Sequence, residues 1–245
     1  MAVCEAVGLR SVLDAQELRA TQGAVMARFF TKNAHEACSM ADALISEAHP
    51  DAVISIECPG ANARGVYHNA RGFDVSDLEA KQDALFDRIC EMGALNIAIG
   101  DLGNEIGMGA IASDLEKHVP YARKGACQCG CGGGIAARTS ADNLITATTS
   151  DWGCYGMIAA LAYLMGDAQI MHDTQIEQKA LTAGAEAGLI DMYGEHIPAI
   201  DGFSLELNLS VVGMMRELVV STLAHTDRCT DWFDRVSELG YFDGK

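Results

Sequence analysis

The sequence predicts an α/β fold with an open, mostly parallel Rossmann-like sheet and helices on both faces. Short runs rich in Val and Ile alternate with longer segments whose apolar residues recur at helical spacing. The chain has 245 residues and is 49% hydrophobic, which suits one large core. Because no internal repeat or low-complexity linker divides it, we expect residues 1–245 to form a single domain.

The expected elements follow from local pattern. Three β-rich runs predict the strands: 52–56, 95–99 and 143–148. Apolar residues spaced three or four positions apart predict the helices: 11–30, 34–48, 76–92, 106–118, 153–165, 173–188 and 204–224. Ser76 and Glu79 match a capping box, and Gly166 matches a C-cap.

Composition and charge narrow the function classes. The formal net charge of −17 repels nucleic acids and anionic membranes, so we expect neither as a partner. The most apolar run, 211–224, is shorter than the roughly 18 residues of a membrane span, and Arg216 and Glu217 interrupt it. No signal peptide is recognisable. We therefore expect a cytoplasmic protein whose nine cysteines are reduced thiols.

Acidic residues follow each predicted strand. The first strand stops at Glu57, the second at Asp101, and the third leads into Asp151. Parallel strands end at one edge of a sheet, where open α/β folds bind ligands. Acidic residues also cap helices after strands, which is the alternative interpretation. Three at corresponding positions favour a shared acidic site.

The segment after the second strand carries the densest polar pattern. Asp101, Asn104 and Glu105 lie among glycines, directly after an apolar run. Oxygen ligands of this kind suit a divalent cation, Mg²⁺ or Mn²⁺, and Asp201 is a further candidate ligand. The alternative is a turn held by Asp and Asn hydrogen bonds to nearby backbone.

Several motifs resemble the D-glutamate cyclase family, over roughly residues 50–215. They are, in order, Ile56-Glu57-Cys58-Pro59-Gly60, Tyr67-His68-Asn69-Ala70-Arg71-Gly72, Gly100-Asp101-Leu102-Gly103-Asn104-Glu105, Gly107-Met108-Gly109, Ser150-Asp151-Trp152-Gly153 and Ile200-Asp201-Gly202. The resemblance implies a lyase that cyclises D-glutamate, or a related acidic amino acid, to 5-oxo-D-proline with loss of water.

Catalytic and binding roles can be assigned within that scheme. Glu57, His68 and Asp151 are candidate bases for the substrate amine. Arginine forks suit carboxylates, so Arg64 and Arg71 are candidates to bind a small acidic substrate, although a brace with Asp74 is equally consistent. Further candidate binding residues are Tyr67, Asn69 and Trp152.

A second kind of metal site is conceivable at Cys127, Cys129 and Cys131. Their thiolates suit Zn²⁺ or another soft metal, with Cys58 or Cys154 as a fourth ligand. The C-x-C-x-C spacing differs from the usual C-x-x-C pairs, so a flexible glycine-rich lid with incidental thiols is favoured.

The sequence departs from the family pattern in three ways. Leu102 replaces a usual Gly, Asp151 replaces a usual Asn, and an N-terminal strand, turn and helix of the family are not recognisable. The extra carboxylate favours a Mn²⁺- or Mg²⁺-dependent, phosphatase-like hydrolase as an alternative. The third departure favours a non-catalytic or half-site subunit, completed by a homo-oligomer or a partner chain.

Overall fold

The computed structural model describes residues 1–225 and 228–243. Its central layer is a parallel three-stranded sheet in the order β3 (Ala52–Ile56), β4 (Leu95–Gly100) and β5 (Asn143–Thr146). A separate parallel pair joins β1 (Arg10–Ser11) to β2 (Ala24–Val25). The predicted open, parallel α/β architecture is therefore confirmed, with each of the three predicted strands in the sheet.

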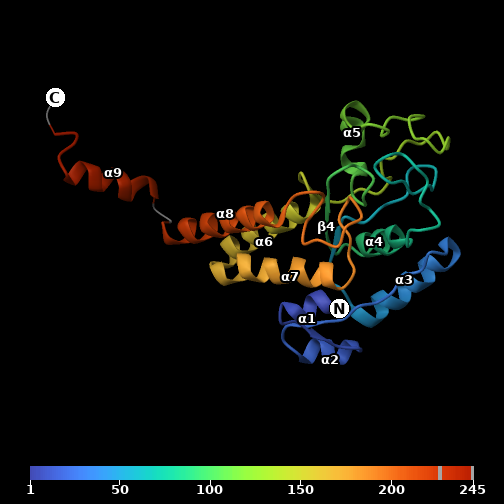
Figure 1. The fold of residues 1–245 in the computed structure, drawn as a ribbon, viewed down its shortest axis with the longest axis horizontal. Helices are drawn as coiled ribbons and strands as arrows, with labels where there is room; N and C mark the ends of the chain where they lie inside the picture. Colours follow the sequence, from blue (N-terminus) through green and yellow to red (C-terminus); the bar gives the residue numbers. More distant parts are fainter. Residues whose placement is uncertain (226–227, 244–245) are drawn as a thin grey trace.

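Helices cover both faces of the three-stranded sheet (Figure 1). On one face Phe86 of α4 (Gln82–Glu91) packs with Ala98 of β4. On the other face α6 (Ser150–Met165) lies so close that a Cβ added at Gly153 would be 2.7 Å from Cγ2 of Ile99. The next layer beyond α4 is α3 (Ala34–Ala48).

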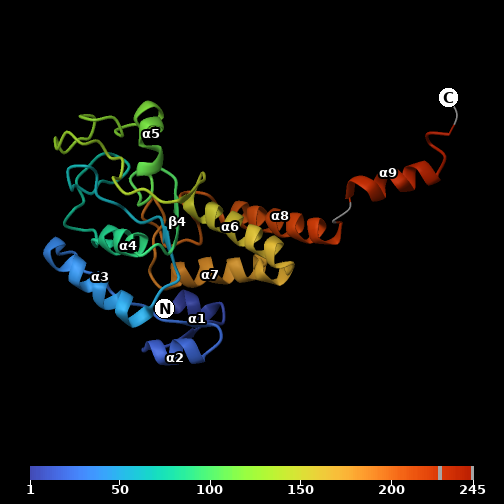
Figure 2. The same ribbon diagram turned by 180° about the vertical axis from the view of Figure 1, so that it is seen from behind.

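A second group of helices extends from the sheet, as two opposite views show (Figures 1 and 2). Here α6 packs with α7 (Thr174–Glu186) and α8 (Leu205–Ala224) around a core that includes Ala162, Met171 and Val212. The remaining helical elements are α1 (Ala2–Ala6), α2 (Ala15–Ala20), η1 (Gly109–Ile111), α5 (Ala112–His118), η2 (Ala168–Ile170) and α9 (Arg228–Glu238).

One predicted helix is wrong over most of its length, and a second begins later than predicted. Residues 11–30 form β1, α2 and β2 instead of one helix, because Asp14 caps a helix of only six residues and Gly23 turns the chain at φ 69°. The helix predicted from residue 76 begins at Gln82. Ser76 does not cap it, since its hydroxyl accepts a hydrogen bond from the Tyr67 backbone.

The helix predicted over 106–118 begins only at Ala112, after the 3-10 turn η1 (Gly109–Ile111), whereas most other helix boundaries lie close to the prediction. Gly166 ends α6 in the left-handed conformation, and Asp173 and Ser204 cap α7 and α8 as expected. Helix α6 begins at Ser150, earlier than predicted, because the Thr149 side chain accepts the backbone N–H of Trp152. This start places Asp151 in the first helical turn, at the same edge as the ends of β3 and β4.

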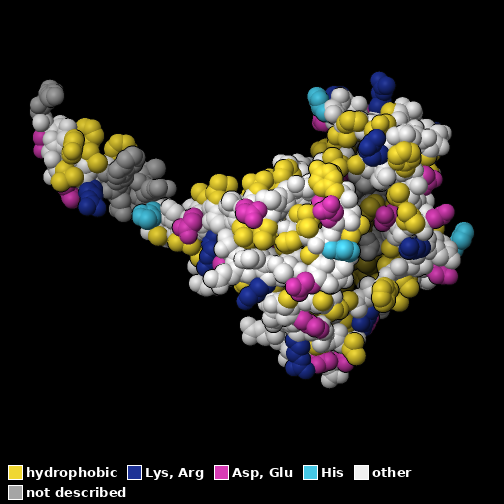
Figure 3. All heavy atoms as spheres, viewed as in Figure 1, with side chains coloured by type: hydrophobic (Ala, Val, Ile, Leu, Met, Phe, Trp, Pro, Cys, Tyr) yellow, Lys and Arg dark blue, Asp and Glu magenta, His cyan; other side chains and the backbone are white. Residues whose placement is uncertain are grey.

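Helix α8 is long and apolar enough to cross a membrane, by length and composition alone. Arg216 on this helix donates a hydrogen bond to the Ala168 carbonyl at 3.1 Å, which fixes one side of it to the fold. Its outer side exposes Leu207, Met214 and Leu218, and Figure 3 shows hydrophobic side chains along this surface. The expectation that no membrane is a partner stays a prediction.

Candidate functional site

Three carboxylates meet at the carboxyl ends of β3 and β4, and we call them the carboxylate cluster. Glu57 directly follows β3, Asp101 directly follows β4, and Glu105 lies on the turn beyond. One carboxylate oxygen from each lies within 4.8 Å of the others. The parallel strands thus bring Glu57 and Asp101 together, as their positions at the strand ends predicted.

Glu105 organises the turn beneath the cluster. Its side chain is 1% exposed, and its two oxygens accept the backbone N–H groups of Asp101, Leu102 and Gly103 at 3.2, 3.0 and 2.7 Å. Hydrogen bonds to an ionised acceptor are stronger than neutral ones. The turn is therefore wrapped around a buried negative charge, and the Asp101 backbone is held in place.

Asp101 carries the least satisfied polar atom of the cluster. Its Oδ1 is buried and has no hydrogen-bond partner among the described residues. Burial raises the pKa of Asp101 to about 8, and the negative charges of Glu57 and Glu105 contribute to that rise. Burying an ionised oxygen without a partner is costly. A bound cation would supply the missing partner and restore the charged form.

Glu57 is held in an unusual backbone conformation, with φ at 47°. Its carboxylate accepts a hydrogen bond from the Ser150 hydroxyl at the start of α6. Burial raises the pKa of Glu57 against the opposing effect of Ser150, and neighbouring acidic groups raise it further. Non-glycine residues with positive φ concentrate at functional sites, so the strain marks this position as a candidate.

Asp151 and Asp201 are two further acidic residues whose charges act on the carboxylate cluster. Burial raises the pKa of each, and both charges act on Glu57. Asp201 also has a positive φ of 48°. Among the described residues, neither belongs to the group of carboxylate oxygens that lie within 4.8 Å of one another, although both act electrostatically on Glu57.

Asn104, a predicted metal ligand, links two loops through a hydrogen bond in the structure. Its Nδ2 donates to the backbone carbonyl of His68 at 3.0 Å. The buried amide therefore joins the turn at the end of β4 to the loop that follows β3. Sequence position alone could not reveal this contact, because it depends on how the two loops pack.

Three predicted substrate-binding residues have partners within the protein. The Tyr67 hydroxyl is buried and donates to Asp83. Asn69 accepts the backbone N–H of Arg71 at 3.0 Å, and Trp152 Nε1 donates to Asn208 at 2.8 Å. These contacts stabilise loops and helix packing. Substrate contact by these residues stays a prediction.

Arg64 and Arg71 are both exposed on the loop between β3 and α4. Within residues 1–225 and 233–243, no ion pair joins either guanidinium to a carboxylate. The predicted alternative, a brace to Asp74, is thus not formed there. Both arginines are available to an anionic ligand, although the structure does not place them against the carboxylate cluster.

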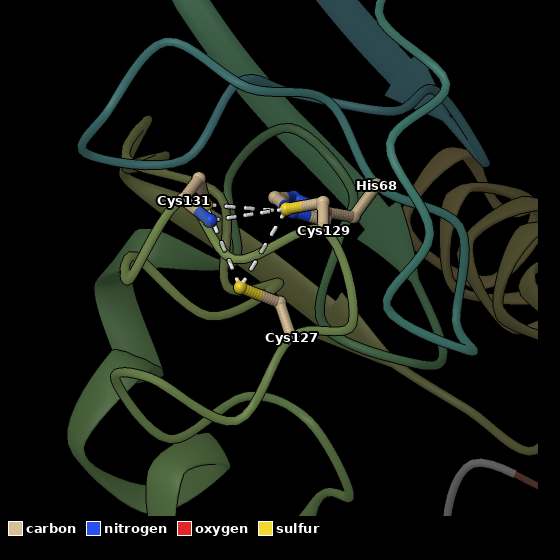
Figure 4. Close-up of side chains that lie close together, drawn as sticks. All are labelled: His68, Cys127, Cys129 and Cys131. Carbon is tan, nitrogen blue, oxygen red and sulfur yellow. Dashed lines mark hydrogen bonds between the residues drawn. The ribbon is translucent and has the colours of Figure 1, made fainter.

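His68 lies in a second cluster, which we call the cysteine cluster (Figure 4). The fully buried imidazole approaches the thiols of Cys127, Cys129 and Cys131. Burial lowers the pKa of His68, so the neutral ring predominates at pH 7. The predicted role of His68 as a base for the substrate amine stays a prediction, and its side chain faces sulfur atoms.

The sequence offered no direct signal for this grouping, since 61 residues separate His68 from Cys129. The expected fourth ligands are elsewhere: Cys58 donates its thiol hydrogen to Gln82, and Cys154 is on α6. Burial of Cys127 raises its pKa, but hydrogen bonds from the Gly134 backbone and neighbouring groups outweigh this and lower the pKa to about 7.

Ser150 is a candidate functional residue that sequence reasoning missed. It lies between Thr149 and Asp151, and only its hydrogen bond to Glu57 distinguishes it from an ordinary first-turn serine. In the sequence, the signal that pointed to a functional role for Ser150 was its position in the Ser-Asp-Trp-Gly motif.

Comparisons with known proteins agree with the motifs. The family model for the C-terminal region of D-glutamate cyclase-like proteins matches residues 1–216. Mitochondrial D-glutamate cyclase from Homo sapiens is 32% identical over 115 residues, which cover 46% of this chain and 17% of that protein. The aligned region is thus under a fifth of that relative's length. The match over residues 1–216 shows that the chain belongs to the D-glutamate cyclase-like family.

Proposed function

We propose that the protein is a lyase that cyclises D-glutamate, or a closely related acidic amino acid, to 5-oxo-D-proline with loss of water. The observation that carries this proposal is the buried, unpartnered oxygen of Asp101 beside Glu57 and Glu105. Family membership and the activity named for the human relative support the choice of substrate.

The donor set fits a hard divalent cation, Mg²⁺ or Mn²⁺. Asp101 and Glu105 offer carboxylate oxygens, which these ions prefer, and Glu57 beside them adds negative charge. When bound there, such a cation supplies Lewis-acid polarisation of the substrate's side-chain carboxylate.

The chain's own residues have defined tasks in this reaction. The substrate nitrogen forms a bond to the γ-carbon, one C–O bond breaks, and the oxygen leaves as water with two protons from the ammonium group. Glu57, whose pKa is raised by burial, is suited to accept a proton from that ammonium group. Asp151 is a second candidate, and Arg64 or Arg71 would bind the α-carboxylate.

The test is a turnover assay with the full chain, D-glutamate and either Mn²⁺ or Mg²⁺, following 5-oxo-D-proline by chiral chromatography. L-Glutamate and a cation-free reaction with EDTA serve as controls. We expect product formation that requires both the cation and Asp101. Absence of product from D-glutamate and related acidic amino acids would contradict the proposal.

The extra carboxylate of Asp151 keeps a phosphatase-like hydrolase as the second candidate. Its charge acts on Glu57, which places it near enough to enlarge the acidic site. Two-metal hydrolases hold their ions about 3.5–4 Å apart. Two Mn²⁺ ions per chain, with release of phosphate from an aryl phosphate, would favour this activity over cyclisation.

Assembly and location are two further parts of the proposal. The exposed apolar side of α8 supports the predicted contact with a second copy or a partner chain. The human relative is named as mitochondrial, whereas the sequence of this chain predicts a cytoplasmic location.

A further inference from the structure

We propose that His68, Cys127, Cys129 and Cys131 bind one Zn²⁺ ion in a closed structural site, distinct from the carboxylate cluster. Figure 4 shows the four side chains directed toward a common point. They come from two loops, one after β3 and one after α5. This inference does not depend on the proposed lyase activity.

The distances between the ligand atoms fit a tetrahedral ion. Cys127 Sγ lies 3.5 Å from Cys131 Sγ and 3.7 Å from Cys129 Sγ. His68 Nε2 lies 3.1 Å from Cys129 Sγ and 3.7 Å from Cys131 Sγ. With Zn–S near 2.3 Å and Zn–N near 2.0 Å, tetrahedral edges are about 3.8 Å between sulfurs and about 3.6 Å between nitrogen and sulfur.

Each observed separation is within about half an ångström of these edges. Small inward or outward movements of the side chains would therefore complete the site. The set of three sulfurs and one imidazole is also a typical donor set of structural zinc, and it is too soft for Mg²⁺.

Several N–H groups donate hydrogen bonds to the sulfur atoms of the cysteine cluster. The Cys131 backbone N–H donates to Cys129 Sγ at 3.4 Å. Cys131 Sγ accepts from the Gly133 backbone and from Asn62 Nδ2, each at 3.4 Å. Such donors stabilise negative charge on sulfur, and the remaining charge of three thiolates is what a divalent cation would neutralise.

The backbone conformation of the loop 127–134 brings the side chains of its three cysteines together. Every second residue from 130 to 134 is a glycine with a left-handed backbone. The φ angles of Gly130, Gly132 and Gly134 are 76°, 78° and 74°. Left-handed residues at every second position coil the chain tightly, as glycine permits. The coil turns Cys127, Cys129 and Cys131 toward one centre instead of spreading them along an extended loop.

The role of this site is structural, because all four positions around the ion are filled by protein ligands. Asn62 already joins the same loops, since its Nδ2 donates to the Gly134 carbonyl at 2.7 Å. The His68 carbonyl accepts from Asn104, which precedes Glu105. Zinc at His68 would thus stabilise the loop against which the turn of the carboxylate cluster is braced.

The experiment is metal analysis of the full chain, purified in a reducing buffer without chelator. We expect about one Zn²⁺ per chain, and near-complete loss of zinc in Cys129→Ser. Cys129→His keeps a zinc ligand at an exposed position and should restore the metal content. Cys38→Ser is the matched control, since Cys38 is an exposed thiol on α3.

Cobalt substitution of the unmutated protein keeps the test independent of variant folding. One bound Co²⁺ should produce thiolate-to-cobalt charge-transfer absorption and the visible bands of a tetrahedral site, and Zn²⁺ should abolish both. Absence of zinc and of these bands after incubation with excess metal would overturn the proposal. A disulfide between two of these cysteines in the reduced-purified protein would overturn it as well.

Discussion

The carboxylate cluster and the cysteine cluster share the loop after β3 but offer different ligand atoms: carboxylate oxygens in the first, and sulfurs with an imidazole nitrogen in the second. The loop after β3 contributes Glu57 to the first and His68 to the second. In the carboxylate cluster, Glu57 is exposed, so the site is open to solvent, and the buried Oδ1 of Asp101 has no partner among the described residues. In the cysteine cluster, His68 is fully buried and four ligands face one another. An open site with hard oxygen donors suits a cation that contacts substrate, whereas a closed site with soft sulfur donors suits a structural metal ion.

Hydrogen bonding separates the two clusters further. Burial and neighbouring negative charges raise the pKa of Asp101 to about 8. At Cys127 burial also raises the pKa, but hydrogen bonds outweigh it and lower the value to about 7. The hydrogen-bond donors of the cysteine cluster therefore favour the thiolate of Cys127, whereas Asp101 Oδ1 in the carboxylate cluster has no such donor among the described residues.

The largest expected effect is loss of turnover in Asp101→Asn. The amide keeps the size of the side chain but removes the charge that holds the cation, so kcat for D-glutamate should fall by about 10³-fold or more. Steady-state kinetics with saturating Mn²⁺ measures it. Zinc content should stay unchanged, and Asp114→Asn on the surface of α5 is the control. Equal turnover in Asp101→Asn and the unmutated protein would contradict the separation of roles.

Glu57→Gln should have the next largest effect. Removing a general base costs typically 10²- to 10⁴-fold in rate, and we expect a fall in kcat of about 10²-fold because Asp151 can partly replace it. Ser150→Ala removes only the hydrogen bond to Glu57 and should cost less. A rate loss in Ser150→Ala that exceeds that in Glu57→Gln would argue against Glu57 as the base.

Glu105→Gln tests the structural side of the carboxylate cluster. The amide group would set N–H donors against backbone N–H groups that now donate to the carboxylate. We expect the free energy of unfolding to fall by about 1–3 kcal/mol, measured by urea denaturation. Glu116→Gln, on α5, is the control. An unchanged midpoint would show that the three hydrogen bonds contribute little.

The pH dependence of stability should differ between cation-free and cation-loaded protein. The pKa of Asp101 is about 8 in the folded chain, above its ordinary value of 3.8, so the folded chain retains a proton that the unfolded chain releases. This contribution to stability is present below about pH 4 and is lost as the pH rises toward about 8. In EDTA, thermal melting should show this fall, and Asp101→Asn should reduce it. A slope of the same size in Asp101→Asn would assign the fall to other groups.

The sequence predicted what depends on local pattern and on strand direction. Alternating apolar runs located β3 and β4, and parallel order then brought Glu57 and Asp101 to one edge. It could not place His68 with the cysteines, because that contact depends on the packing of two loops. The Asn104 brace and the Ser150 contact were hidden for the same reason.

The most direct test of the central claim is Mn²⁺ binding to the zinc-loaded full chain, followed by the electron paramagnetic resonance signal of free Mn²⁺. The unmutated protein should remove one Mn²⁺ per chain from solution, and Asp101→Asn should remove none at the same concentrations. Equal Mn²⁺ binding by both proteins, or none by either, would contradict the assignment of the carboxylate cluster as the cation site.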